Sequence, residues 1–199
     1  MRRSAMGFAL GVAALSAATQ AKPRLASGLR DGMRLHYSAA PGDPSTWLVG
    51  PVSPGAAGRA GADCANYVVQ KGPRPSAADS IRQCISGDTL FAVNAAGALV
   101  PSRPVGPNML IETKRQNGAT MSYRTGAMSV DTIGGEAIPV VITTYTYLEV
   151  NGTPSNQLRE RYAVSLGTAT RGEFFVPDPA KPNQWTSSRV FRLERIEKP

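Results

Sequence analysis

The stretch AIPVVITTYTYLEV, residues 137–150, is the clearest indication of fold in this 199-residue chain. Most of its residues are β-branched or aromatic, and these residue types are enriched in strands. Asn151-Gly152 follows, and both of these residues tolerate the positive φ that a tight turn requires. Residues 156–164 return with a strand-like composition, so we predict an antiparallel hairpin centred on the Asn-Gly pair.

The two faces of this hairpin follow from its register. With a loop of two or four residues, paired positions have opposite number parity, which places Tyr145 and Tyr147 on the face that carries Tyr162. A three-residue loop would reverse the assignment, because one residue of slip moves every side chain to the other face. We take these three tyrosines as candidate ligand-binding residues. The alternative is an ordinary core with the phenol hydroxyls at its rim.

Outward from the hairpin, shorter runs of the same character predict further strands joined by turns. We expect Gly50-Pro51 to end one run, Pro101 and Pro104 to end another, and Asn117-Gly118 to form a second hairpin turn. One short helix is expected near Asp79–Ile81. The last run also fits a helical period, but its β context favours a strand. The predicted strands lie at residues 33–37, 47–49, 66–71, 81–85, 89–93, 98–100, 109–115, 120–124, 130–133, 173–176 and 189–196.

The composition agrees with a turn-rich β protein. The chain contains 20 Gly and 16 Pro, which is high for a helical bundle but short of a low-complexity sequence. Hydrophobic residues make up 42% of the chain, enough for a packed core. We therefore predict an all-β fold, mainly an antiparallel meander of about ten strands. It would form a curved sheet, partial barrel or sandwich, with at most one short helix besides the signal peptide.

The N-terminus has the three zones of a secretory signal peptide. Arg2 and Arg3 precede an uncharged, mostly apolar run at residues 6–18, and small residues surround Ala21. We expect cleavage after Ala21, with Ala18 as the alternative. The arginine pair leaves open whether the general secretory or the twin-arginine route is used.

This N-terminal pattern sets the expected domain organisation. Residues 1–21 would be the signal peptide and residues 22–199 a single β domain, located in the periplasm or secreted. The apolar run is shorter than the ~20 residues that a membrane-spanning helix needs. We expect no transmembrane span after cleavage.

The two cysteines, Cys64 and Cys84, both lie in the segment that would be exported. Oxidising compartments favour a disulfide between such residues. The alternatives are two buried free thiols, or a nucleophilic cysteine beside His36. Because the sequence around Cys64, ADCAN, matches no nucleophile signature, we predict a structural disulfide.

The charge pattern and the metal-binding residue types limit the possible partners. The formal net charge is +8, but the basic residues are spread from Lys22 to Lys198 and form no run. A nucleic-acid binder would gather them on one face, so no nucleic-acid partner is predicted. One His and two Cys are too few for the common zinc and iron–sulfur sites. We predict no metal and no cofactor.

Signatures of catalysis are weak. A Ser-His-Asp site would have to use His36, which we expect to face solvent, and the chain contains neither a G-x-S-x-G nor an S-x-x-K motif. A glycosidase-like site needs two facing carboxylates. The acids that fall within or beside the predicted strands are better explained as surface residues: Glu112, Asp131, Glu136, Glu160 and Glu173.

The sequence thus predicts an exported, non-enzymatic β-domain protein of the periplasm or envelope. It would bind an apolar or amphiphilic ligand on a concave sheet face, or an envelope protein as partner. One alternative is a structural or assembly protein that associates through sheet edges. The other is a hydrolase with a carboxylate-based site.

Overall fold

The computed structural model describes residues 28–54, 63–71, 74–94, 96–115, 117–181 and 184–199. The predicted signal peptide, residues 1–21, lies outside the described residues. Within the described residues, no helix is long and apolar enough to cross a membrane.

The described residues form twelve antiparallel strands and one 3₁₀ turn, η1 (Val164–Leu166), which confirms the all-β prediction. The sequence suggested ten or so strands, and the separate runs predicted at residues 120–124 and 130–133 both belong to β8. They are β1 (Arg34–Ala40), β2 (Ser45–Pro54), β3 (Asp63–Lys71), β4 (Arg74–Ser86), β5 (Thr89–Val93), β6 (Leu99–Pro104), β7 (Leu110–Lys114), β8 (Thr120–Ile133), β9 (Glu136–Leu148), β10 (Pro154–Ala163), β11 (Thr168–Pro177) and β12 (Trp185–Glu197).

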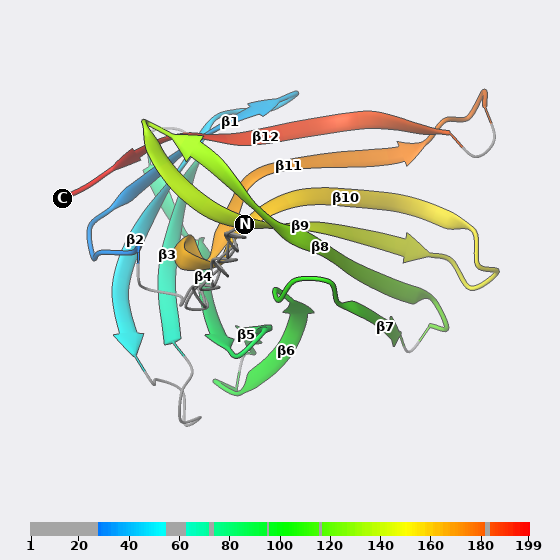
Figure 1. Cartoon of the computed structure of the whole chain (residues 1–199), viewed down its shortest axis with the longest axis horizontal. Helices are drawn as coiled ribbons and strands as arrows, with labels where there is room; N and C mark the ends of the chain where they lie inside the picture. The colour runs from blue at the N-terminus through cyan, green and yellow to red at the C-terminus, as the bar shows by residue number, and fades with distance from the viewer. Residues whose placement is uncertain (1–27, 55–62, 72–73, 95, 116, 182–183) are drawn as a thin grey trace, which may run out of the picture.

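The strands form one sheet in meander order. The order across the sheet is β6-β5-β4-β3-β2-β1-β12-β11-β10-β9-β8-β7, so each strand pairs with its chain neighbours, except that β6 does not pair with β7. Pairing of β1 with β12 brings the two ends of the meander together. The sheet therefore curls into a nearly closed, barrel-like shape whose two edges, β6 and β7, follow one another in the chain (Figure 1).

The connection between these two edges is fastened to the strands on either side. The amides of Val105 and Gly106 donate to the Asp88 carbonyl oxygen at 2.8 and 3.3 Å. On the other side, the Thr125 hydroxyl donates to the Gly106 carbonyl at 2.6 Å, and the Asn108 amide donates to the Gly126 carbonyl at 3.0 Å. The gap between the edges is thus bridged at one end by the connecting chain.

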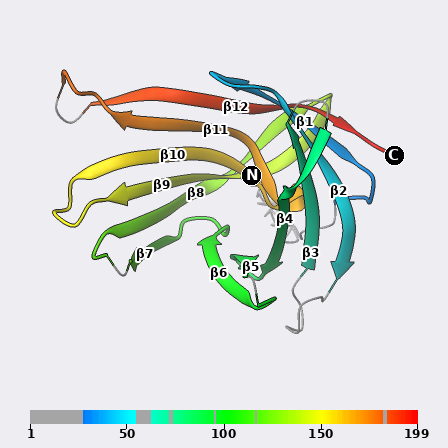
Figure 2. The same cartoon turned by 180° about the vertical axis from the view of Figure 1, so that it is seen from behind.

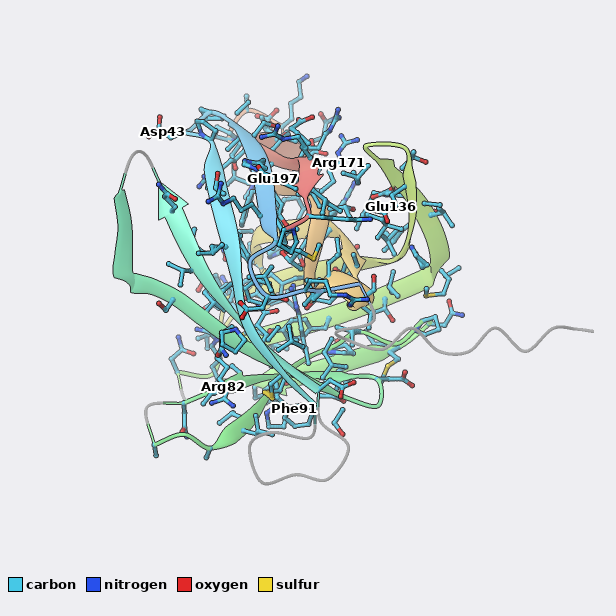
Figure 3. The ribbon with its side chains drawn as sticks, turned by 90° about the vertical axis from the view of Figure 1, so that its left-hand side faces the viewer. Asp43, Arg82, Phe91, Glu136, Arg171 and Glu197 are labelled. Atoms are coloured by element: carbon cyan, nitrogen blue, oxygen red, sulfur yellow. A yellow bond between two sulfur atoms is a disulfide. The ribbon has the colours of Figure 1, made fainter. Side chains whose placement is uncertain are left out.

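The sheet has two parts that enclose its interior. The long strands β8–β12 run side by side as one wall with the short strand β7 at its edge, and β1–β6 curve away from it, as Figures 1 and 2 show from opposite sides. Figure 3 draws the side chains on this sheet and labels Arg82 and Phe91 toward the lower end of the molecule and Arg171 and Glu197 toward the upper end. Most buried side chains form one apolar cluster that draws on both parts, including Leu35, Val49, Tyr67, Val140 and Tyr162.

Three local expectations are wrong, each because of how the strand packs in the sheet. Residues 81–85 belong to β4 and no helix forms at Asp79–Ile81, because β3 and β5 pair with this strand on its two sides. β2 continues beyond Gly50-Pro51, and an irregularity in its register between Val49 and Val52 accommodates the proline. Pro104 ends β6 as expected, but Pro101 lies within the strand and does not end it, because an edge strand tolerates a missing N–H.

The predicted disulfide joins Cys64 to Cys84. The two residues lie directly opposite one another on β3 and β4, with Cα atoms 4.0 Å apart. Both are buried, together with Phe91 of β5, in a small second cluster separate from the main core. The bond thus ties two neighbouring strands together and forms part of this second cluster.

Candidate ligand-binding cavity

Two cross-strand rows of side chains line the inner face of the β8–β12 wall. In antiparallel sheets, directly opposed residues share a face, so each row can be followed from strand to strand. The outer row is Tyr123, Tyr145, Leu158, Phe174 and Arg189. The deeper row is Thr125, Thr143, Glu160, Gly172 and Phe191.

Aromatic rings extend the wall into the curved half of the sheet. Phe174 lies 6.2 Å from Phe191, measured between ring centroids, and Phe191 lies 6.3 Å from Tyr37. Tyr37 is 5.4 Å from Trp47, which is 5.7 Å from Tyr67. All four pairs are tilted or edge-on, the arrangements that aromatic rings prefer. A continuous aromatic surface therefore runs from β11 through β12, β1 and β2 to β3.

A cavity of about 410 Å³ lies against this surface. Its apolar lining includes Trp47, Phe174 and Phe191, and its polar lining includes Arg103 and Glu160. Ligand pockets typically span roughly 300–1,000 Å³ and combine apolar walls with a few polar groups. The cavity has the size and the mixed lining of a small-molecule site.

Gly172 makes room for one wall of the cavity. It lies directly opposite Phe191 on the neighbouring strand, and a Cβ atom at this position would stand 2.1 Å from the Phe191 ring. The ring therefore packs over the bare backbone of β11. A side chain at residue 172 would push it out of place.

A polar network occupies the inner end of the cavity. Arg103 of β6 donates to the Glu160 carboxylate of β10, and its guanidinium lies over the Tyr162 ring, 4.6 Å from the centroid. The Tyr162 hydroxyl donates to Gln83 Oε1 of β4 at 3.3 Å, and Thr143 Oγ1 donates to Glu160 Oε2 at 3.5 Å. These contacts join the edge strand β6, β4 and the β9–β10 hairpin across the interior.

Burial and nearby polar or charged groups shift the pKa values of these side chains in opposite directions. Burial disfavours the charged form of Arg103, but Glu160 and Tyr162 together outweigh it, so the pKa of the guanidinium is raised. Burial also raises the pKa of Tyr162 and Tyr37 above that of a free phenol, although Arg103 lowers the first and Thr168 the second. The cavity lining therefore contains an ion pair and the neutral phenol of Tyr37, while the neutral phenol of Tyr162 lies behind Arg103.

The expectation that the strand acids are surface residues is wrong for Glu160. Its side chain is 8% exposed, whereas Glu112 and Glu136 are exposed as expected. Asp131 is partly buried and pairs with Arg161, whose Nε lies 2.6 Å from its carboxylate. Burial of Glu160 is possible because Arg103 neutralises it from a strand that is remote in sequence.

The three candidate tyrosines share one face but lie at different depths. Tyr145 pairs with Leu158 in the outer row, and Tyr162 pairs with Val141 further along the same face, so the predicted register is correct. Tyr162 is fully buried behind Arg103. Tyr145 and Tyr147 are half-buried in the part of the wall that extends beyond the cavity. None of the three lines the cavity, and their role in binding stays a prediction.

His36 lies away from the cavity. It is partly exposed, its Nε2 is 3.0 Å from Glu197 Oε2, and Thr46 Oγ1 lies 3.2 Å from its Nδ1. The hydrogen bond to His36, with nearby arginines, lowers the pKa of the Glu197 carboxyl. The disulfide occupies both cysteines, so the alternative of a nucleophilic cysteine beside this histidine does not hold.

The charged and aromatic lining was missed at the sequence level, although one signal was present. Arg189 shares its parity in β12 with Phe191 and Leu193, which places a cation in an apolar row. Arg103 stands between two prolines, where no alternation reveals its face. Among the described residues, no group of three or more His, Cys, Asp or Glu side chains could hold a metal ion.

Comparisons with known proteins give no family. No family model and no curated protein matches the chain. Among solved structures, it is similar to a protein of Bacteroides fragilis that is proposed to be exported and has a YmcC-like fold. The TM-score is 0.49 and the identity 14%, over 88% of this chain and 98% of that one.

Proposed function

We propose that this protein is an exported, non-enzymatic β-domain protein of the periplasm or envelope that binds an amphiphilic ligand in its interior cavity. The cavity of about 410 Å³ carries this proposal, because aromatic side chains line one side of it and an ion pair its inner end. An apolar ligand body would gain about 25 cal/mol for each Å² removed from water. Polar groups at the cavity wall would fix its orientation.

Export is supported by two independent features. Residues 1–21 have the zones of a signal peptide. The chain forms the Cys64–Cys84 disulfide, and disulfides persist in oxidising compartments but are rare in the cytosol. N-terminal sequencing of the exported protein should return Lys22 as its first residue. A sequence that begins at Met1 would contradict processing.

The state of the acids supports a binding protein over a hydrolase. Glycosidase-type chemistry needs one carboxylate free to act as an acid and a second free as a base or nucleophile. Glu160 is engaged by Arg103 and Thr143, and Asp131 by Arg161 and Thr170. In both cases the carboxylate is already occupied by an arginine and a threonine hydroxyl.

Native mass spectrometry of the protein purified from the envelope fraction of its source organism tests the proposal. A bound small molecule that is released on unfolding is the expected result. The variant Trp47→Ala, which removes a large part of the aromatic lining, should lose that mass. A protein that is free of small molecules and that also fails to take up an added fluorescent amphiphile would contradict ligand binding.

One observation favours assembly through a sheet edge as the second candidate. All five residues of the edge strand β7 are exposed, and Leu110 is exposed over 57% of its surface. Unprotected edges of this kind can add a further strand from a partner. Sedimentation of the purified protein checks this: an oligomer that Ile111→Lys dissolves would favour assembly, and a monomer would count against association with itself.

A further inference from the structure

Arg189 stands apart from the other charged groups that line the cavity. Among the described lining residues, only Arg103, Glu160 and Arg189 are charged. Arg103 and Glu160 form an ion pair with each other, so their charges cancel. Arg189 takes part in none of the ion pairs or hydrogen bonds between described residues. The lining therefore carries one uncompensated positive charge.

The position of Arg189 places this charge where the cavity opens to solvent. The residue is exposed and pairs directly with Phe174, whose ring belongs to the aromatic wall. Its guanidinium lies beside the turn between β1 and β2, because Nη2 would be 3.3 Å from a Cβ atom on Gly42. Ser38 and Ser45, which flank this turn, also line the cavity. A cation thus adjoins the aromatic surface at the solvent-facing side of the cavity.

The inner end of the cavity imposes the opposite requirement. Arg103 and Glu160 satisfy one another there, and a further charge brought beside them would be desolvated without a partner. The buried part of a ligand should therefore be uncharged. Any charged group on the ligand should remain at the Arg189 side, where water and the guanidinium both stabilise it.

We infer that the cavity selects an amphiphile with an uncharged apolar body and a single anionic group, a carboxylate or a phosphate, which pairs with Arg189. This inference rests on the proposed ligand-binding function and specifies its ligand class. Arginine suits both anions because its planar N–H fork matches their oxygen atoms. The aromatic wall from Phe174 to Trp47 accommodates the apolar body.

Four ligands of equal chain length, titrated calorimetrically below their micelle concentrations, test the inference. They are decanoate, decyl phosphate, decanol and decyltrimethylammonium. Both anions should bind more tightly than decanol, and the cation should bind most weakly. The preference between carboxylate and phosphate then separates a fatty acid from a phosphorylated lipid as the source of the ligand.

Variants of Arg189 provide the second arm. Arg189→Gln should weaken the binding of both anions about tenfold, as expected for one partly exposed charge-assisted hydrogen bond, and leave decanol unchanged. Arg192→Gln makes the same change of charge on the opposite parity of β12 and should have no effect on any of the four. Arg189→Glu should bind the cation more tightly than the parent protein does, a gain that misfolding cannot produce.

The outcomes separate the inference from the function on which it rests. Equal affinity for decanoate and the cation, or an equal loss of anion and decanol binding in Arg189→Gln, would overturn the anion inference and leave ligand binding standing. No binding of any of the four ligands by the parent protein would overturn both. Tighter binding of the anions that depends on residue 189 but not on residue 192 is the result we expect.

Discussion

Arg103 on β6 and Glu160 on β10 form an ion pair through the interior of the sheet, although 57 residues separate them in the chain. β6 is one edge of the sheet, and β10 lies within the wall that faces it. No backbone hydrogen bonds pair β6 with β7. The ion pair therefore helps to hold the edge strand β6 in place, as hydrogen bonds between neighbouring strands do in the rest of the sheet. The pair holds an edge strand against the interior and forms the inner end of the cavity.

The first prediction concerns this pair. Arg103→Met or Glu160→Gln alone should lower the free energy of unfolding by about 3–5 kcal/mol, because each change disrupts a buried ion pair and leaves the remaining partner poorly compensated. The double variant should lose less than the sum of the two single losses. Urea denaturation of the four proteins gives the coupling energy. Additive losses would mean that the pair contributes nothing through its mutual contact.

The remoteness of these partners explains which features the sequence could predict. The β9–β10 hairpin, its register and the shared face of Tyr145 and Tyr162 depend on residues a few positions apart, and local composition suffices for them. The meander order follows from the short loops. The pairing of β1 with β12 curls the sheet and joins the first and last strands of the described chain. Because the two strands are far apart in sequence, no local residue pattern predicts this pairing.

The cavity depends on such long-range relationships throughout. Its aromatic wall draws on Trp47 and Phe191, which come together only because β1 lies between β2 and β12 in the sheet. The burial of Glu160 depends on Arg103, so the parity of β10 alone could not separate a surface acid from an interior one. Cys64 and Cys84 were predictable because only one pairing of two cysteines exists.

The second prediction concerns Gly172. Gly172→Ala should displace the Phe191 ring, since the new Cβ atom would stand 2.1 Å from it, and should cost about 1–3 kcal/mol of stability as overpacking does. Amphiphile affinity should fall as well, because Phe191 lines the cavity. Gly126→Ala is the matched control, with its nearest neighbour at an ordinary 3.7 Å. Equal effects of the two changes would argue against the proposed role of Gly172.

The third prediction concerns Tyr162, which is fully buried. Tyr162→Ala should destabilise the protein by about 3–5 kcal/mol, as large aromatic truncations do in cores. Tyr162→Phe keeps the ring beneath Arg103 but loses the hydrogen bonds of the hydroxyl to Gln83 and Arg103, so it should cost about 1–2 kcal/mol, less than the alanine variant. Chemical denaturation measures both. A small loss for the alanine variant with a large loss of ligand binding would instead make Tyr162 a binding residue.

The fourth prediction concerns the disulfide. Cys64→Ser should lower the free energy of unfolding of the oxidised protein by roughly 2–4 kcal/mol, because the bond restricts the unfolded chain. The variant in which both cysteines are serine should be no less stable than the single variant. Thiol titration of the unfolded, unreduced protein should detect no free cysteine. Two reactive thiols in that experiment would refute the bond.

The fifth prediction concerns alkaline pH. Burial raises the pKa of Tyr37, Tyr67 and Tyr162 above the value of 10.0 for a free phenol. In the unfolded chain these phenols ionise near pH 10, whereas in the folded protein they stay neutral. Their contribution to stability is therefore complete below pH 10 and is lost as the pH rises further. Each buried tyrosine should remove about 1.4 kcal/mol per pH unit.

Three such groups give a combined slope of about 4 kcal/mol per pH unit, so a protein with about 5–15 kcal/mol of stability should unfold cooperatively roughly one to four pH units above pH 10. Tyrosinate absorbance should then rise in the same step in which the near-ultraviolet circular dichroism is lost. Tyr37→Phe removes one ionising group and should reduce the slope by about one third, although it also removes the 3.0 Å hydrogen bond to the Ala169 carbonyl. The slope is the decisive quantity, because that lost bond changes stability equally at every pH. A gradual rise in tyrosinate absorbance from all six tyrosines, while the circular dichroism stays intact, would show that these phenols reach solvent in the folded state.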